Sequence, residues 1–397
     1  MDKARPAFEP GGKLSAFRSV YDGMDTFLFT PRETSRSGVH IHDSMDSKRA
    51  MIIVVLSLLP CLVFGMYNCG YQHWLACGAT EFPFWGLLLY GFLAILPSIV
   101  VTYLVGLGIE FAVAQMRGEE IQEGFLVTGI LIPMICPIET PLWMIAVATA
   151  FSVIFVKEVF GGTGYNIFNV ALVTRAFLFF AYPAKMSGDG VFVSLGSMLG
   201  LGGQAPDGFT GATPLGQIAV SGARSASDLS AAFSDVAGNH IDLWHMFLGL
   251  IPGSFGETST LCILVGALIL LLTGIASWRV ILSVFAGGAV MALVANWFAT
   301  PTYPASFLSV GEQLCLGGFA FAAVFMASDP VTSCRTNVGK YVYGFLVGVV
   351  AILIRTYNNG YPEGAMLAVL LMNALAPLID YCVVEANVRR RLARAKS

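Results

Sequence analysis

Charged residues are scarce in this sequence. Asp, Glu, Lys and Arg make up only 12% of the 397 residues, whereas an average soluble protein carries roughly 25%. So little charge cannot cover the surface of a water-soluble protein of this length, which excludes a globular cytosolic enzyme. Disorder is excluded as well, because a disordered chain combines low hydrophobicity with high charge.

The sequence also lacks the residue patterns of several common sites. The net charge is only −3, so no surface for nucleic acid is indicated. The eight cysteines show no CxxC or ferredoxin spacing and the five histidines are scattered, so we expect no metal cluster and no haem. A disulfide between Cys69 and Cys77, which share one predicted loop, is a possibility that the spacing leaves open.

Apolar residues dominate instead, at 56% of the chain. A helix needs roughly 20 apolar residues to cross the hydrocarbon core of a membrane. Ten charge-poor runs are present, which we interpret as the spans of an all-α integral membrane protein. They are 50–67, 84–106, 124–136, 140–157, 167–183, 259–275, 278–298, 313–327, 340–355 and 364–384. The polar residues that precede them contain no signal-peptide core.

The distribution of Lys and Arg predicts how these spans are oriented. Basic residues concentrate on the cytoplasmic side of membrane proteins. The N-terminal tail, residues 1–49, holds eight of them, and the basic C-terminal tail, residues 386–397, holds five. Predicted loops on the same side hold five more, whereas loops on the opposite side hold three. Both tails are therefore expected in the cytoplasm, which agrees with an even number of spans.

A long insertion at 184–258 divides the spans into two sets of five, within residues 50–183 and 259–385. Its Gly-, Ser-, Ala- and Asp-rich sequence predicts a folded extracytoplasmic loop or small subdomain. Because five is an odd number, two related halves would lie in the membrane with opposite orientations. The third span of each half is short and ends at Cys136-Pro137 or Asp329-Pro330. Paired short, interrupted segments are typical of inverted-repeat transporter folds.

The insertion contains the motif Asp207-Gly208-Phe209-Thr210-Gly211-Ala212-Thr213. By its residues alone this is an ordinary turn, because Gly and Asp favour turns and a bare hydroxyl is a weak nucleophile. The string resembles, however, the signal Asp-x-x-(Ser/Thr)-Gly-Ala-Thr of proteins that receive FMN through a phosphoester bond. That resemblance implies that Thr213 is the acceptor and that an extracytoplasmic flavin transferase is a partner. The other residues of the signal would be Asp207, Thr210, Gly211 and Ala212.

A second motif runs from Lys157 to Asn169 and is rich in glycine. Glycines allow a backbone to approach a ligand closely. Asn166 and Asn169 are three residues apart, so we expect them to share a helix face, where their amides suit the edge of a flavin ring. Helix capping by asparagine is the alternative. Arg175 lies in the following span, where it would pair with Glu158 or contact a cofactor anion.

Two further groups of polar residues lie at the ends of spans or inside them. Thr258 and Ser259 precede the sixth span, and a helix start of this kind either holds a phosphate or is simply capped. The acids Glu110, Asp329 and Asp380 are candidates for an ion path, because acids within membranes often mark one. A role in a turn is the alternative for Asp329.

Taken together, these motifs resemble the B subunit of the sodium-translocating NADH:quinone oxidoreductases. The resemblance covers nearly the whole chain. The D subunit of the Rnf complexes is the alternative relative, since it shares the membrane core and the flavinylated threonine but lacks such a long N-terminal tail. The motifs that carry the resemblance lie at 21–31, 37–43, 46–49, 160–169, 175–183, 207–213, 252–261 and 326–330, together with the basic C-terminal tail.

The resemblance implies a ten-helix fold similar to urea transporters, with two inverted five-helix repeats and short, broken third helices. It implies covalent FMN on Thr213, riboflavin at Asn166 and Asn169, and a quinone region near Gly106. Electrons from NADH would cross both flavins to a quinone, coupled to Na+ export through the acids named above. The chain would work beside subunits A, C, D, E and F in a bacterial inner membrane. Two departures are Val170 in place of a common proline and Leu107 in place of a second glycine after Gly106.

A channel or secondary transporter with the same core and no redox role is the rival interpretation. It explains the spans and the short third segments, but it leaves the motif at 207–213 without a purpose. A structural membrane scaffold, the third interpretation, predicts neither flavin nor ion flux.

Overall fold

The computed structural model is α-helical wherever it describes the chain. It describes residues 21, 38–39, 47–79, 81–118, 124–186, 191–203, 211–358, 360 and 363–396. Within these residues there is no β-strand, only the isolated bridges Met198–Leu201 and Ser234–His240. The expected all-α class is thereby confirmed.

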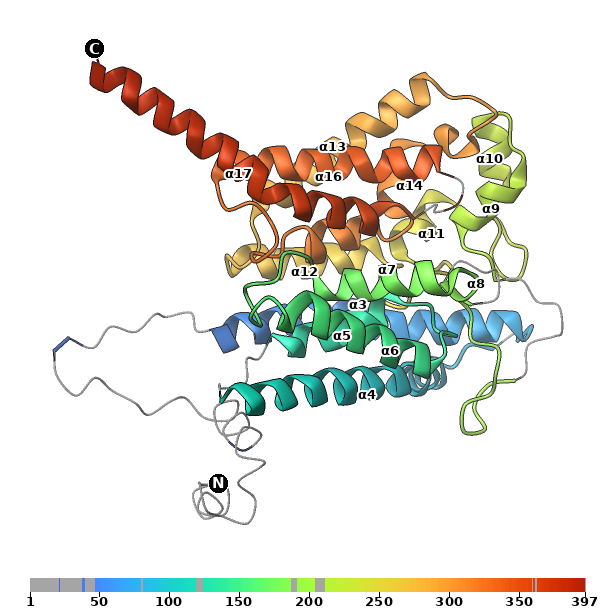
Figure 1. Cartoon of the computed structure of the whole chain (residues 1–397). Helices are drawn as coiled ribbons and strands as arrows, with labels where there is room; N and C mark the ends of the chain where they lie inside the picture. Colours follow the sequence, from blue (N-terminus) through green and yellow to red (C-terminus); the bar gives the residue numbers. More distant parts are fainter. Residues whose placement is uncertain are drawn as a thin grey trace.

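Five helices are long and apolar enough to cross a membrane. Their sequences are nearly continuous apolar runs, so both lipid and neighbouring helices are suitable surroundings. Pro60, Pro97 and Pro377 lie inside three of them, which membrane helices tolerate because nearby groups satisfy the freed carbonyls. The five are α3 (Ser47–Ala76), α4 (Phe84–Arg117), α13 (Trp278–Trp297), α16 (Asn337–Tyr357) and α17 (Ala365–Lys396) (Figure 1).

Shorter helical segments lie within the other five predicted spans. The third segment of each half is short or interrupted, as the sequence indicates. Membrane crossing by all ten segments, and the inverted repeat, stay predictions. The shorter segments are α5 (Phe125–Ile135), α6 (Leu142–Ser152) continued by the π-helix η2 (Val153–Glu158), α7 (Val170–Ala181), α12 (Thr260–Leu272), and the set α14 (Val310–Cys315), α15 (Phe319–Phe321) and π-helix η4 (Ala322–Met326).

The later interruption is a double-glycine turn between α14 and α15. Gly317 and Gly318 both have left-handed backbones, with φ of 60° and 65°, which other residues rarely adopt. A methyl group on Gly318 would also overlap the Glu257 carboxylate. The turn thus allows a charged side chain to approach the backbone inside the helical body.

The described part of the insertion contains four short helices. The last three of them pack around their own apolar cluster, which includes Leu229, Phe233 and Met246 and extends to Leu308 and Leu316. Figure 1 shows α9 and α10 at one end of the helical body, opposite the start of α3 and the end of α17. The four are α8 (Pro183–Met186), α9 (Pro214–Ser221), α10 (Ala226–Ala232) and α11 (Leu243–Leu248), and the 3-10 helix η3 (Pro304–Phe307) packs beside α9 and α10.

Side-chain caps begin α10 and α11. Ser225 accepts a hydrogen bond from the Asp228 amide, and Asp242 accepts one from the His245 amide. The bonds from the backbone and the imidazole of His245 hold the pKa of Asp242 below its usual range. These caps satisfy helix-start N–H groups that would otherwise lack a partner.

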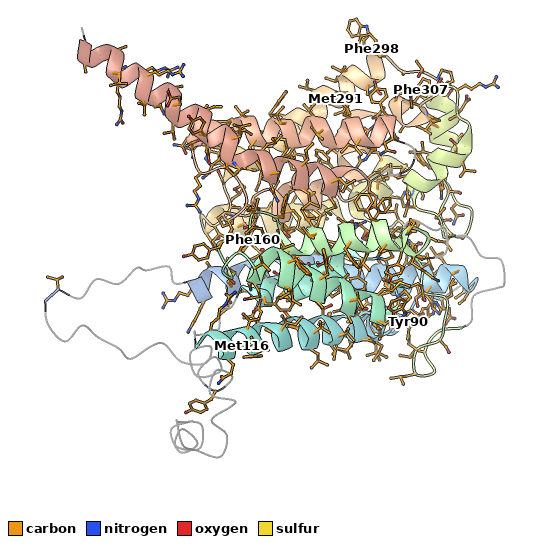
Figure 2. All side chains as sticks on the ribbon, viewed as in Figure 1. Tyr90, Met116, Phe160, Met291, Phe298 and Phe307 are labelled. Carbon is orange, nitrogen blue, oxygen red and sulfur yellow. The ribbon has the colours of Figure 1, made fainter. Side chains whose placement is uncertain are left out.

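Many large apolar side chains are exposed on the helical body. Met116, Phe160 and Phe298 are exposed examples labelled in Figure 2. Exposed apolar surface on this scale is unusual for a soluble monomer. It fits a multi-pass membrane protein whose outer face meets lipid.

The possible disulfide between Cys69 and Cys77 is wrong. All eight cysteines are free thiols. Helix α3 continues to Ala76, so eight residues of helix separate the two thiols, a rise of roughly 12 Å. A disulfide requires Cα atoms within about 7 Å. The predicted loop is therefore the last two turns of a helix.

Helix α4 offers a direct test of the packing. A methyl group on Gly91 would overlap the Met66 carbonyl of α3, whereas one on Gly108 would meet open space. We expect Gly91→Ala to lower the free energy of unfolding by about 2 kcal/mol through overpacking. Gly108→Ala should be neutral or stabilising by up to about 1 kcal/mol, because alanine favours the helix. Thermal unfolding of both variants in detergent measures this, and equal effects would contradict the α3–α4 contact.

Candidate functional site

Two pockets bring together five of the residues singled out in the sequence, namely Thr213 and Thr258 in one and Asn166, Asn169 and Asp329 in the other. The Thr213 pocket, of about 380 Å³, is lined by Thr213, Glu257, Gly317 and Glu363, among others. The Asn169 pocket, of about 930 Å³, is lined by residues of several helices and of the glycine-rich motif. Its polar lining comprises Thr128, Lys157, Thr163, Asn166, Asn169, Ser328 and Asp329.

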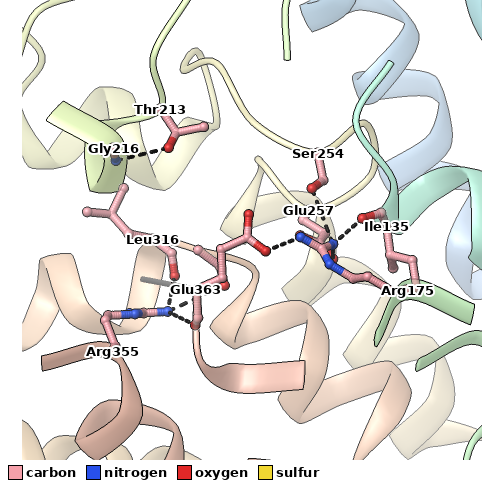
Figure 3. A network of polar contacts seen from close by, with 10 residues as sticks. Ile135, Arg175, Thr213, Gly216, Ser254, Glu257, Leu316, Arg355 and Glu363 are labelled. Carbon is pink, nitrogen blue, oxygen red and sulfur yellow. Dashed lines mark hydrogen bonds and ion pairs between the residues drawn. The ribbon is translucent and has the colours of Figure 1, made fainter. Parts of the chain in front are cut away.

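Thr213 is the N-cap of α9. Its hydroxyl accepts a hydrogen bond from the Gly216 amide at 3.2 Å (Figure 3), and Pro214, with its fixed φ, begins the helix. The hydroxyl therefore lies at the positive end of a helix and at the wall of a pocket. Gly211 and Ala212 precede it, whereas Asp207 and Thr210 lie outside the described residues.

A buried network of charges adjoins this pocket (Figure 3). The Arg175 guanidinium donates to the Ile135 carbonyl at the end of α5, to Ser254 Oγ at 3.3 Å and to Glu257 Oε1 at 3.0 Å. It also forms an ion pair with the Glu363 carboxylate. Arg175 is 2% exposed, so these bonds supply the compensation that a buried charge requires.

Arg355 forms the second part of the same network. Its guanidinium donates to the carbonyls of Gln313 at 2.5 Å and Leu316 at 2.8 Å, at the end of α14. It also donates to the backbone carbonyl of Glu363 at 3.3 Å. Glu363 thus links both arginines through its carboxylate and its carbonyl.

The expected pairing of Arg175 with Glu158 is wrong. Glu158 pairs instead with Arg117, at 3.6 Å, near the chain surface. Glu158 ends η2, whereas Arg175 lies on α7 beside the end of α5. The network around Arg175 is therefore made of residues that the sequence did not single out for it, Glu257 and Glu363 above all.

Ser259 and Thr258 have structural partners. Ser259 caps α12 by accepting a bond from the Cys262 amide at 3.3 Å. Thr258 accepts a bond from Asn68 at 3.4 Å and lines the Thr213 pocket. For Ser259 the capping alternative is confirmed.

The Asn169 pocket lies at the start of α7. Asn169 caps this helix by accepting bonds from the Ala171 and Leu172 amides, and its own amide donates to Asp329 Oδ2 at 3.3 Å. Asn166 donates to the Phe168 carbonyl at 2.9 Å. The expectation of a shared helix face is wrong, because α7 begins only at Val170. Both asparagines nevertheless line one pocket, from the loop before the helix.

One pocket residue has an unused polar group. The Thr163 hydroxyl is buried and finds no hydrogen-bond partner among the described residues. A buried hydroxyl without a partner is unfavourable by about 1–3 kcal/mol. Thr163 belongs to the glycine-rich motif, but the sequence alone predicts no role for it.

The three candidate acids have different surroundings. Glu110 is buried and paired with Lys157, and Lys157 lines the Asn169 pocket. Asp329 lines the same pocket and also accepts bonds from Val331 N and Thr332 Oγ1, so its turn role is real. Asp380 is not in the lining of either pocket. It accepts bonds from the Arg335 and Thr336 amides and the Thr336 hydroxyl, before α16.

Gly106 is a site of close packing. A methyl group there would overlap the Phe125 ring, which occupies the space beside α4. Among the described residues, no group of three or more His, Cys, Asp and Glu side chains could hold a metal ion. The polar chemistry is thus concentrated in the two pockets and the network.

Comparison with known proteins identifies the family. The profile of the NQR2, RnfD and RnfE family matches residues 34–389. The chain belongs to this family. Three relatives are each named as the B subunit of a Na(+)-translocating NADH-quinone reductase. The protein of Chromohalobacter salexigens is 42% identical over 99% of this chain and 95% of its own length. Those of Azotobacter vinelandii and Yersinia pestis are 41% identical, over 99% and 100% of this chain and 98% of their own lengths.

The match to the NQR2, RnfD and RnfE family spans both pockets and the charged network. The relatives also cover the N-terminal tail, because their alignments include 99–100% of this chain. Similarity therefore extends over every described helix.

The charged network makes a prediction for stability. Arg175→Met removes the cation that Glu257 and Glu363 share and leaves them buried, so we expect a loss of about 3–5 kcal/mol in the free energy of unfolding. Arg389→Met is the control, because Arg389 and Glu385 form an exposed pair on α17 whose loss should change stability by less than about 1 kcal/mol. Thermal unfolding in detergent compares them. Similar stabilities would contradict a structural role for the network.

Proposed function

We propose that this chain is the membrane subunit of a sodium-translocating NADH:quinone reductase. The support is the identity of 41–42% to proteins of that name over nearly the whole chain. NADH, a quinone and Na+ would be the substrates of the complex. Coverage of the N-terminal tail by these relatives favours the B subunit of such a complex over the Rnf-type alternative.

Its topology would be ten spans in two inverted repeats, in a bacterial inner membrane. Helices within each predicted span support this, as does the location of the insertion at the end of the body opposite the start of α3 and the end of α17. With the basic tails in the cytoplasm, the insertion would be periplasmic. There it would be open to an extracytoplasmic flavin transferase.

Covalent FMN on Thr213 is the central element of the proposal. The supporting observation is the Thr213 hydroxyl, held at the N-cap of α9 and at the wall of a pocket. A phosphate esterified there would meet the positive dipole end of the helix. Gly211 and Ala212, without large side chains, leave the approach to the hydroxyl open.

Riboflavin would occupy the Asn169 pocket. The unused Thr163 hydroxyl supports this, because a polar ligand would satisfy it. Asn166 and Asn169 offer amides, and apolar residues such as Leu131 and Phe325 offer walls for a planar ring. When bound, the two flavins supply the electron-transfer chemistry that no side chain of this chain can supply.

The residues of the chain would bind the two flavins, orient them and insulate them from their surroundings. Arg175 is five residues after Val170, which lines the Asn169 pocket, and its partners Glu257 and Glu363 line the Thr213 pocket. The network would thereby keep the two pockets in a fixed relation. Glu110, Asp329 and Asp380 would serve Na+ transfer, and the packed region at Gly106 would adjoin the quinone.

Variants of Thr213 test the covalent flavin. Thr213→Ala should abolish in-gel flavin fluorescence of the denatured chain, because no hydroxyl is left to esterify. Thr213→Asn should do the same while keeping the cap, since asparagine caps as well as threonine. Ser225→Ala, which removes the neighbouring cap of α10, should keep its fluorescence. Fluorescence undiminished in Thr213→Asn would refute attachment at Thr213.

A pair of threonines tests the riboflavin site. Thr163→Val and Thr149→Val each remove a buried hydroxyl that has no partner among the described residues, so both should leave stability equal or slightly higher. Only Thr163 lines the Asn169 pocket. We therefore expect Thr163→Val alone to lower the extractable, non-covalent riboflavin of the purified complex, measured by chromatography with fluorescence detection. Equal riboflavin in both variants would speak against this pocket.

A further inference from the structure

A buried ion pair joins α4 to the π-helix η2. The Glu110 and Lys157 side chains are 5% and 6% exposed, and the Lys157 ammonium donates directly to the Glu110 carboxylate. The ammonium also lies 6.0 Å from the centre of the Phe125 ring. A carboxylate this deeply buried needs a cation beside it, and here the chain supplies that cation itself.

The neighbouring pair on the same two elements is different. Arg117 and Glu158 are partly exposed and 3.6 Å apart. Exposed pairs contribute little to stability and tolerate loss of one partner. Of these two pairs, only Glu110–Lys157 contains a carboxylate so deeply buried that it needs the side-chain cation beside it.

Lys157 also borders a second acid. It lines the Asn169 pocket together with Asp329. The hydrogen bonds recorded for Asp329 come from neutral donors, namely Asn169, Thr332 and the Val331 amide. Among the described residues, no Lys or Arg forms an ion pair with it. Lys157 therefore neutralises one buried acid and lines a pocket in which a second, partly exposed acid has no Lys or Arg partner among the described residues.

Lysine is suited to two positions. Its ammonium is a compact point charge on a flexible four-carbon stem, with three rotatable donors. It is carried by η2, and π-helical turns occur often at functional sites. Turning the stem into the pocket would transfer the positive charge from Glu110 toward Asp329 without moving the backbone.

We propose that Lys157 is a tethered cation that closes Glu110 to sodium. Na+ and the ammonium exclude one another at this carboxylate, so Na+ enters only when Lys157 turns into the Asn169 pocket toward Asp329. Each acid then has one cation, whereas before Na+ enters one cation serves the two acids. Lys157 is thus a positioning residue, and the inference rests on the proposed role of Glu110 in Na+ transfer.

Thermal unfolding of the purified complex tests this in NaCl and in choline chloride at equal ionic strength. Lys157→Met should lower the unfolding temperature of this subunit by roughly 5 °C in choline, because Glu110 loses its partner. Replacing choline by Na+ should restore at least half of that loss, since Na+ binds the freed carboxylate. In wild-type protein the Lys157 ammonium occupies the site beside the Glu110 carboxylate. Its unfolding temperature should therefore rise much less when Na+ replaces choline.

Two controls identify the carboxylate as the sodium ligand. Lys157→Met with Glu110→Gln should unfold near the wild-type temperature in choline and gain no more from Na+ than wild type. Arg117→Met, in the neighbouring exposed pair, should show no special response to Na+. If Lys157→Met cannot be isolated, Lys157→Gln serves with the same expectations.

Three results would overturn the proposal. The first is Lys157→Met as stable as wild type in choline. The second is Lys157→Met with a lowered unfolding temperature that Na+ does not raise. The third is an equal rise in unfolding temperature with Na+ when Glu110→Gln is added to Lys157→Met. Visible spectra of the same samples report separately on the proposed function. Sodium restoration in a chain without flavin would refute the flavin assignments alone, whereas flavin without sodium restoration would refute the tethered cation alone.

Discussion

Two buried arginines donate hydrogen bonds to the carbonyls at the ends of broken helices in the interior of this protein. Helices α5 and α14 end inside the body, where their last carbonyls have no water to bond. The Gly256 amide donates a hydrogen bond to the Met134 carbonyl, and the Arg175 guanidinium donates one to the Ile135 carbonyl. The Arg355 guanidinium donates to the Gln313 and Leu316 carbonyls at the end of α14. A guanidinium suits this task because it has five donors and its charge complements the negative end of a helix.

Burying two guanidiniums requires compensation in turn. The carboxylates of Glu257 and Glu363 provide it for Arg175, whereas backbone carbonyls, that of Glu363 among them, provide it for Arg355. The result is a network that ties α5, α7, α14, α16 and the chain before α12 and α17 to one point. Glu257 and Glu363 of this network line the Thr213 pocket, and Val170, on the same helix as Arg175, lines the Asn169 pocket. The same constraint explains the double glycine at 317–318, since Glu257 and Arg355 approach the backbone there more closely than any β-carbon would allow.

Local patterns predicted a large part of this arrangement. Apolar runs located the helices, and prolines and short runs located the broken third segments. The two asparagines of the glycine-rich motif do line one pocket, although the helix face expected from their spacing is absent. The partners of Arg175 could not be predicted, because Glu257 and Glu363 are 82 and 188 residues away along the chain. Such pairs depend on how helices cross. The wrong partner, Glu158, was the nearest acid before Arg175 in the sequence. The shared face of Asn166 and Asn169 failed because a cap at Asn169 delays the start of α7.

The account rests most heavily on the Thr213 hydroxyl, which the fold holds at a helix start beside a pocket. Mass spectrometry of the proteolytic peptide that contains Thr213, from the complex purified out of a membrane with its own flavin transferase, tests that claim most directly. The account predicts a peptide heavier by FMN less one water, with the modification on Thr213 and a flavin spectrum for the peptide. An unmodified peptide from a fully assembled, active complex would contradict it.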